Sequence, residues 1–399
     1  MIQLGFRMRK GSFKFLFVVL VVSVLLTNCG SDAPTQSLDV GVAGDGNLQA
    51  VLEEVREDYG LPALAAVLVH EGEVVELAAT GRRAAGFDEL ATAGDQWHIG
   101  SLTKGMTATL AAILVERGVI SWDTTVGAVF SELVGSMRAE YVDIRLDELL
   151  YHTAGMVSDI MRAPSWGSLR SDPAPITEQR LRFASELLAL PPDGPRDVYL
   201  YSNAGYIVAG AMLERVTGDS WEELMMTEVF TRLGMASSGF GPPGSPGRRD
   251  EPWGHIPSGG DWFGVEPGPN ADNPAAVGPA GTVHVSLADY GEYLAEHIAG
   301  ARGEGTLVTA DTYLKLHTPA SGSPYALGWG VAERAWAGGK VLNHQGSNTM
   351  WFATVWLAPE RELGMFAVSN AAEDAGQRGS DAAVVALLTR FEAAMKDGE

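Results

Sequence analysis

Short apolar runs of strand length lie near both ends of the 399-residue chain, and they constrain the fold more than any other feature. Two early runs flank a Glu71-Gly72 turn and predict a β-hairpin, and three more runs follow late in the chain. The runs cover residues 64–70, 74–80, 327–333, 351–357 and 363–369. Strands at both ends with helices between them predict one antiparallel sheet built from both termini.

Most of the remaining sequence has helical periodicity. The predicted helices cover residues 47–59, 102–117, 145–151, 177–190, 204–216, 221–233, 287–299 and 372–395. We therefore expect an α+β fold: an antiparallel β-sheet flanked by N- and C-terminal helices, with an inserted, mainly helical lobe. The sheet lobe should span about 47–100 and 320–395, and the helical lobe about 101–319, with a cleft between the two.

Ser101 opens the predicted helix at 102–117, and Lys104 follows it by one turn. Residues three apart on a helix share a face, so the Lys104 side chain would lie within reach of the Ser101 hydroxyl. A Ser needs a neighbouring base or a tuned cation to act as a nucleophile near neutral pH. The alternative interpretation is an ordinary N-cap Ser followed by a surface Lys.

A second candidate group is Tyr201 with Asn203, one hundred residues later. A phenol acts as a general base only if its pKa, about 10 when unperturbed, is lowered, and Lys104 could lower it. The Asn203 amide could bind substrate or hold the Lys. The alternative is a strand-to-helix turn with Asn203 as the N-cap.

A third candidate group is His344, Gly346 and Ser347, which lies just before the apolar run at 351–357. A Gly at this position would let a substrate backbone approach closely. Taken alone, a His-x-Gly sequence fits a structural His better than a functional one.

Together and in this order, the three groups resemble the penicillin-recognising serine hydrolases, in the branch that holds class C β-lactamases, D-alanyl-D-alanine peptidases and related esterases. That family carries Ser-x-x-Lys, then Tyr-x-Asn, then Lys-Thr-Gly or His-x-Gly. Residues 149–156, 278–282, 327–330 and 357–361 also resemble family segments. The resemblance covers roughly residues 47–395 and implies a β-lactamase/transpeptidase-like fold.

The resemblance implies a role for each matching residue. Ser101 would be the acylated nucleophile, and Lys104 and Tyr201 would share proton transfer. The backbone N–H groups of Ser101 and Ser347 would form the oxyanion hole, where one donor is typically worth about 3 kcal/mol of barrier. Asn203, His344 and Gly346 would bind or orient the substrate.

His344 departs from the Lys of class C β-lactamases. A Lys is charged and pairs with a substrate carboxylate, whereas a His near pH 7 is mostly neutral. An esterase or amidase acting on a small neutral acyl substrate therefore fits better. If His344 lines the pocket as a neutral group, acidification through the His pKa should make carboxylate substrates relatively better. The alternatives are a D-Ala-D-Ala carboxypeptidase or a class C-like β-lactamase.

The N-terminus predicts export. Four basic residues precede an apolar run at 15–26, which has the length of a signal peptide core. Cys29, the only Cys, follows in a sequence that resembles a bacterial lipobox, although Asn28 replaces the usual small residue. We expect residues 1–28 to be a lipoprotein signal peptide, with Cys29 anchoring the protein to the membrane of the cell envelope. Gly30 favours the outer membrane where a cell has one, and the alternative is ordinary signal peptidase cleavage.

Residues 29–46 are rich in Ser, Asp, Gly and Pro and predict a flexible tether. Residues 1–28 carry four basic and no acidic side chains, so without them the net charge of −22 becomes −26. Such acidity argues against nucleic-acid binding.

Rival chemistries lack their motifs. The chain has no Gly-x-Ser-x-Gly, His-Glu-x-x-His or phosphate-binding Gly loop, so we expect no metal and no cofactor. A catalytically silent envelope binding protein of the same fold remains the alternative to an enzyme. His152 should order its loop, and the Gly- and Pro-rich stretch 240–281, with its aromatic residues, should form a substrate-pocket lid.

Overall fold

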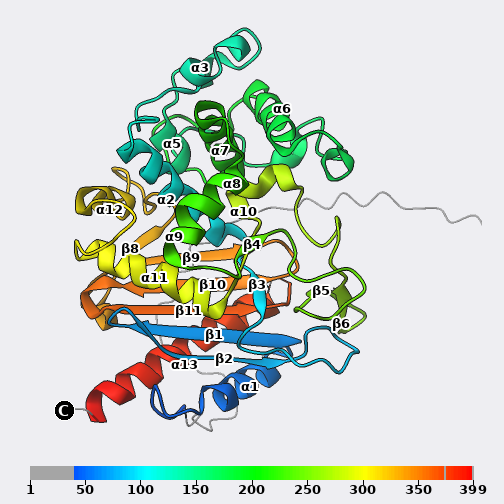
Figure 1. The fold of residues 1–399 in the computed structure, drawn as a ribbon, viewed down its shortest axis with the longest axis vertical. Helices are drawn as coiled ribbons and strands as arrows, with labels where there is room; N and C mark the ends of the chain where they lie inside the picture. The colour runs from blue at the N-terminus through cyan, green and yellow to red at the C-terminus, as the bar shows by residue number, and fades with distance from the viewer. Residues whose placement is uncertain (1–39, 373, 398–399) are drawn as a thin grey trace, which may run out of the picture. The chain divides into compact units, whose positions relative to one another are not determined.

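Six strands pair antiparallel in one sheet of order β2-β1-β11-β10-β9-β8 (Figure 1). They are β1 Ala63–His70, β2 Glu73–Gly81, β8 Gly330–Arg334, β9 Gly339–Ser347, β10 Phe352–Ala358 and β11 Leu363–Ser369. The computed structural model describes residues 40–372 and 374–397. β1 pairs directly with β11, with Leu64 opposite Ser369. The predicted antiparallel sheet built from both ends of the chain is confirmed.

The strand β9 was not predicted. Lys, Asn, His, Gln and Gly make up much of it, so no apolar run marks it in the sequence. It lies between β10 and β8, and His344 stands opposite Val355 of β10. β8 begins at Gly330, later than the predicted start at residue 327, because Gly328 has a φ of +85° and interrupts the extended backbone.

The sheet is covered on both faces. Alternate residues of a strand point to opposite faces, and along β1 Ala65 and Val67 enter one hydrophobic core while Leu64 and Leu68 enter the other. Helices α1 Leu48–Asp58 and α13 Ala375–Asp397 pack on one side, as predicted for the terminal helices.

Helix α11, Leu287–Ala301, contacts β1, β2 and β11 and covers the opposite face (Figure 1). The predicted helical lobe of 101–319 is therefore wrong at this helix, which belongs to the sheet layers. The physical reason is that this second apolar face also needs a cover.

The helical lobe contains most of the remaining helices. They are α2 Thr103–Glu116, α3 Val126–Val129, α4 Ala139–Val142, α5 Leu146–Leu150, α6 Ile176–Ala189, α7 Asn203–Thr217, α8 Trp221–Met225, the π-helical η5 Met226–Phe230, α9 Thr231–Leu233, α10 Gly278–Gly281 and α12 Ala310–Leu316. Single 3₁₀ turns are η1 Gly100–Leu102, η2 Ser131–Leu133, η3 Ile160–Arg162, η4 Leu169–Ser171, η6 Ala275–Val277, η7 Ala335–Ala337 and η8 Pro359–Arg361. A small sheet of order β3-β7-β4 joins β3 Gln96–His98, β7 Val283–Ser286 and β4 Gly239–Phe240.

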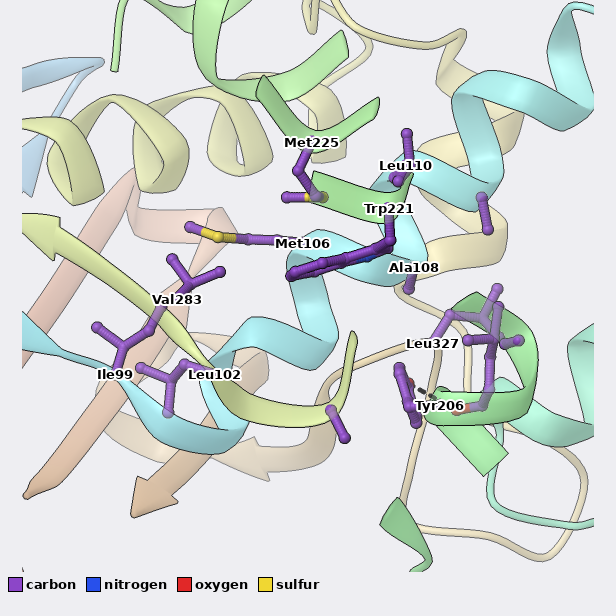
Figure 2. Close-up of a cluster of buried hydrophobic side chains, with 14 of the residues drawn as sticks. Ile99, Leu102, Met106, Ala108, Leu110, Tyr206, Trp221, Met225, Val283 and Leu327 are labelled. Carbon is purple, nitrogen blue, oxygen red and sulfur yellow. Dashed lines mark hydrogen bonds between the residues drawn. The ribbon is translucent and has the colours of Figure 1, made fainter. Parts of the chain in front are cut away.

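Helix α2 is buried along nearly its whole length, since most of its residues are apolar or small. Met106 and Leu110 pack near Trp221 and Met225 of α8, and Val283 of β7 lies near the start of the helix (Figure 2). The helix that follows Ser101 is therefore fixed inside the core and positions its first turn.

The stretch 240–281 is held by its aromatic residues. It contains a hairpin of β5 Gly254–Ser258 and β6 Asp261–Val265. The ring of His255 accepts a hydrogen bond from the Ala85 N–H at 2.9 Å and lies 2.7 Å from the Asn370 carbonyl oxygen. The Trp262 indole donates to the Gly60 carbonyl at 2.6 Å. The aromatic residues that suggested a lid thus anchor this hairpin beside residues 60, 85 and 370.

Residues 40–46 pack on the domain, so the prediction of a flexible tether over 29–46 is wrong for this last part. Arg390 of α13 is buried and donates to the Val42 carbonyl at 2.8 Å, to Asp45 at 2.6 Å and to Glu76 at 2.7 Å. Cys29, the predicted signal peptide and the rest of the tether lie outside the described residues. Within the described part of the chain, no helix has the length and hydropathy needed to cross a membrane.

Replacing Arg390 by Ala should lower the free energy of unfolding by about 2 kcal/mol, because the Glu76 carboxylate would stay buried without its cation. Urea denaturation measures the change. Arg378→Ala is the matched control on the same helix, since Arg378 is exposed and should contribute less than about 0.5 kcal/mol. Equal effects of the two substitutions would contradict the assignment.

Candidate active site

Ser101 lies in the 3₁₀ turn η1, directly before α2, and is half-buried. The preceding Gly100 has a φ of +51°, which a Gly adopts without strain. The Nζ atom of Lys104 lies 3.0 Å from the Ser101 Oγ, as the spacing predicted. It also donates to the Ala280 carbonyl at 2.6 Å. That carbonyl belongs to α10, in the family-like segment 278–282.

Lys104 is completely buried. Burial disfavours the charged amine, so the pKa of Lys104 lies well below its ordinary value of 10.5. Among residues 40–372 and 374–397, no carboxylate forms an ion pair with Lys104. The centroids of the Tyr201 and Tyr206 rings lie 5.0 and 5.6 Å from its Nζ atom. A neutral amine at this distance can accept the proton of the Ser101 hydroxyl. The alternative of a surface Lys is wrong.

Tyr201 also lies close to Ser101, since its ring centroid is 5.0 Å from the Lys104 Nζ atom. Burial raises the pKa of Tyr201 above its ordinary value, and the nearby Ser101 side chain opposes this only in part. The hypothesis that Lys104 lowers the pKa of this phenol is therefore wrong, because desolvation dominates in a buried site. The neutral phenol can still pass a proton on, by accepting one as it donates its own.

Asn203 is the first residue of α7, and the N-cap is Ser202 rather than Asn203. The Ser202 hydroxyl donates to the Val157 carbonyl at 2.6 Å, and its N–H donates to His152 Nδ1 at 3.1 Å. The Asn203 amide has no hydrogen-bond partner among residues 40–372 and 374–397. It is therefore free to contact a substrate.

Gly346 and Ser347 bring β9 against the turn that carries Ser101. A β-carbon built on Gly346 would lie 2.1 Å from the Ile99 carbonyl oxygen and 2.8 Å from the Ser101 nitrogen. A β-carbon on Gly100 would lie 2.4 Å from the Ser347 nitrogen. Gly346 thus makes room for the turn η1 rather than for a substrate backbone, which corrects the predicted reason for it. The two glycines let η1 and β9 approach closely at Ser101 and Ser347.

His344 has partners for both ring nitrogens. Nδ1 lies 2.6 Å from the Gln345 carbonyl oxygen, so it carries the proton, and Nε2 accepts from the Tyr325 hydroxyl at 2.8 Å. Burial and, to a smaller extent, the nearby Lys104 lower the pKa of His344 to about 3. The expectation that mild acid would charge this ring is wrong, because the ring is desolvated.

Tyr325 and His152 complete the wall of the site, and no spacing in the sequence marked Tyr325. The rings of His152 and Tyr201 lie 4.3 Å apart, and those of His152 and Tyr325 4.7 Å apart. Since His152 Nδ1 accepts from a backbone N–H, Nε2 carries the ring proton, and it has no hydrogen-bond partner in the described structure. His152 packs against the Tyr201 ring, in keeping with an ordering role.

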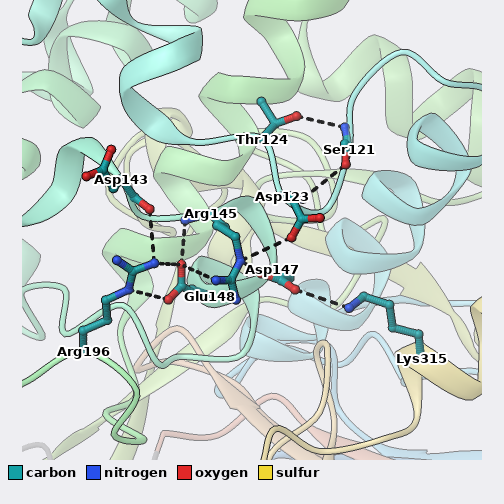
Figure 3. A network of polar contacts seen from close by, with 9 residues as sticks. All are labelled: Ser121, Asp123, Thr124, Asp143, Arg145, Asp147, Glu148, Arg196 and Lys315. Carbon is teal, nitrogen blue, oxygen red and sulfur yellow. Dashed lines mark hydrogen bonds and ion pairs between the residues drawn. The ribbon is translucent and has the colours of Figure 1, made fainter.

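A polar network fixes the loops that carry His152 and Tyr201 (Figure 3). The buried Glu148 carboxylate accepts two hydrogen bonds from Arg196, at 2.6 and 2.7 Å, and one from the Arg145 N–H. The Glu148 carbonyl accepts from the Thr153 N–H at 2.9 Å. Backbone bonds then join residues 197 and 200 to residues 153 and 152. The loop that ends in Tyr201 is thereby held against the loop of His152.

Comparison with known proteins identifies the family. A family model described as Beta-lactamase matches residues 48–390. The chain belongs to the beta-lactamase family. It is an enzyme of the serine hydrolase class with the β-lactamase/transpeptidase-like fold that the sequence resemblance implied.

Individual relatives cover a range of hydrolases. Penicillin-binding protein 4 of Amycolatopsis lactamdurans is 26% identical over 322 residues, which cover 78% of this chain and 81% of the relative. Lovastatin esterase of Penicillium rubens is 28% identical over 188 residues, 43% of this chain and 47% of the esterase. The solved structure of a D-stereospecific amidohydrolase from Streptomyces sp. has a TM-score of 0.66 and 20% identity, with 84% of this chain and 97% of that chain covered.

The His344 ring should remain neutral at about pH 5, more than one unit below the ordinary midpoint for His. Nitrogen-15 NMR of the imidazole, assigned by its loss in His344→Gln, measures this. The unfolded chain protonates the ring near 6.5, so this group lowers the stability of the folded protein progressively as the pH falls from about 6.5 toward 3. A midpoint above 6 would contradict the burial argument.

Proposed function

We propose that this beta-lactamase-family hydrolase cleaves esters or amides through an acyl-enzyme on Ser101. The observation that carries the proposal is the buried Lys104 amine, which lies 3.0 Å from the Ser101 hydroxyl and 5.0 Å from the centroid of the Tyr201 ring. A catalytically silent binding protein would need neither a Ser at this turn nor a desolvated amine beside it. The alternative of a catalytically silent binding protein therefore gains no support from this arrangement.

In the acylation step, Lys104 accepts the Ser101 proton, either directly or through Tyr201. The Ser101 Oγ then forms a bond to the substrate carbonyl carbon. The negative charge moves to the carbonyl oxygen, where the N–H groups of Ser101 and Ser347 stabilise it. The bond to the leaving group breaks as the carbonyl re-forms, and the proton held by Lys104 passes to the leaving oxygen or nitrogen.

Deacylation reverses these roles with water as the nucleophile. Tyr201, whose ring centroid lies 5.0 Å from Lys104 Nζ, is the group that we expect to receive the proton of this water and to pass it to Lys104. The proton finally returns to the Ser101 Oγ as the acyl bond breaks. The free Asn203 amide is suited to hold the acyl portion of the substrate during both steps.

A small neutral acyl substrate fits this site best. The two basic side chains at the proposed centre, Lys104 and His344, are buried and have lowered pKa values, so neither offers a permanent charge to a substrate carboxylate. The names of relatives, an esterase and an amidohydrolase, agree with this class. A penicillin-binding protein among the relatives keeps a D-Ala-D-Ala carboxypeptidase or a β-lactamase as the second candidate.

The wild-type protein should hydrolyse p-nitrophenyl butyrate with a higher kcat/KM than nitrocefin, at neutral and at mildly acidic pH. Ser101→Ala should abolish turnover, and Lys104→Ala and Tyr201→Phe should each lower kcat/KM by at least about 10²-fold. Lys315→Ala, which removes a part-exposed ammonium on α12, is the matched control and should retain activity. Full activity in Ser101→Ala would contradict the mechanism, and nitrocefin turnover that rivals the ester would favour the β-lactamase.

We also propose that the protein is exported and anchored to the cell envelope by lipid on Cys29. The support is the basic start, the apolar run at 15–26 and the position of the only Cys. Several acyl chains at about 0.8 kcal/mol per buried CH₂ would give stable attachment. Cys29→Ser should therefore appear in the soluble fraction or remain unprocessed on fractionation. A fully processed Cys29→Ser protein in the membrane fraction would contradict lipid anchoring.

A further inference from the structure

A buried chain of three side chains connects the two backbone segments that carry the proposed oxyanion donors. The Gly100 N–H donates to His98 Nδ1 at 3.1 Å. His98 Nε2 lies 2.9 Å from Asp272 Oδ2, and Asn348 Nδ2 donates to Asp272 Oδ1 at 3.0 Å. His98, Asp272 and Asn348 are each at most 3% exposed.

Both ends of this chain are adjacent to a donor. Gly100 immediately precedes Ser101 at the start of η1, and Asn348 immediately follows Ser347 at the end of β9. The Asn348 side chain also accepts from the Met350 N–H at 3.1 Å, which fixes the turn after β9. In the described structure, β9 belongs to the six-stranded sheet and β3, which precedes η1, to the three-stranded sheet. The three side chains therefore connect two segments that are not paired as strands.

The hydrogen bonds specify one tautomer of His98. Because Nδ1 accepts from a backbone N–H, the ring proton must be on Nε2, where it points to the Asp272 carboxylate. Asp272 in turn is held from outside, since Arg170 donates to its backbone carbonyl at 2.9 Å and the Asn273 N–H donates to its Oδ1 at 2.7 Å. His284 of β7 stands opposite His98, but its ring is hydrogen-bonded to the Gly241 carbonyl and takes no part in these contacts.

We propose that His98, Asp272 and Asn348 are positioning residues that fix the separation and orientation of the Ser101 and Ser347 N–H groups. The proposal rests on the proposed acyl-enzyme function. The three residues do not touch the reacting atoms. They act on the transition state through the backbone, so their loss should lower kcat while the substrate affinity changes little.

Two substitutions of His98 separate this role from simple packing. The Asn δ-atoms overlie His Nδ1, so His98→Asn can keep the acceptor for the Gly100 N–H, whereas His98→Gln keeps only the contact with Asp272. If His98 merely fills space, the larger Gln should be the milder change. If it positions Ser101, His98→Asn should be milder, and His98→Gln should lose roughly 10- to 100-fold in kcat with KM within about threefold of wild type.

Asp272→Asn tests the other link. Its amide NH₂ group can face His98 Nε2 and so favour the opposite tautomer, which would place a proton on Nδ1 against the Gly100 N–H. The same logic makes a carboxylate-to-amide change harmful where a carboxylate sets a His tautomer. We expect a loss in kcat comparable with that of His98→Gln. His284 is a neighbouring His that does not belong to the hydrogen-bonded series His98–Asp272–Asn348. The substitution His284→Gln is therefore the matched control and should retain kcat.

The experiment measures kcat and KM with p-nitrophenyl butyrate, the thermal midpoint, and the inhibition constant of a boronic acid, whose tetrahedral adduct on Ser places an oxygen where the oxyanion forms. The inhibitor should weaken in parallel with kcat in His98→Gln and Asp272→Asn. If the wild type is active, an unchanged kcat in His98→Gln and Asp272→Asn would overturn the positioning role alone. A smaller loss of kcat in His98→Gln than in His98→Asn would do the same. A wild type that hydrolyses no ester would overturn the proposed function and this inference with it.

Discussion

The burial of Lys104 is the constraint on which the rest of the site depends. Burial in the first turn of a core helix destabilises the charged form of the amine, so its pKa falls, and we propose that it acts as the base. The surroundings fit a neutral amine: one backbone carbonyl, the Ser101 hydroxyl and two aromatic rings. The same desolvation keeps the Tyr201 phenol and the His344 imidazole neutral. We therefore propose an uncharged site, which would suit neutral substrates.

Close approach of η1 and β9 then places Lys104 near the backbone N–H groups of Ser101 and Ser347, the proposed oxyanion donors. Gly100 and Gly346 remove the two side chains that would separate η1 from β9, and the segment that ends in α10 supplies the Ala280 carbonyl. The sheet provides β9, the helical lobe provides α2 and α7, and the hydrogen bonds around Glu148 hold the loop of Tyr201. Each functional group therefore comes from a different part of the chain, and rigid packing brings them together.

The sequence could predict what depends on local periodicity and spacing. Apolar runs predicted five of the six strands of the main sheet, and a separation of three residues predicted the contact between Ser101 and Lys104. It could not predict β9, whose polar residues give no pattern, or Tyr325, which reaches His344 only in the folded chain. It also missed the effect of desolvation on Tyr201 and the partners of His98, since burial and contacts between distant residues are set by tertiary packing.

Direct titration of the Lys104 amine tests the central claim. The chain holds only six lysines, so carbon-13 labelling at Cε should give few resonances, with Lys104 assigned by its loss in Lys104→Arg. We expect this one resonance to titrate well below 10.5, and the part-exposed Lys315 to serve as the internal reference. A Lys104 midpoint near 10.5 would mean a charged amine at neutral pH. That result would contradict both the uncharged site and the role of Lys104 as the base.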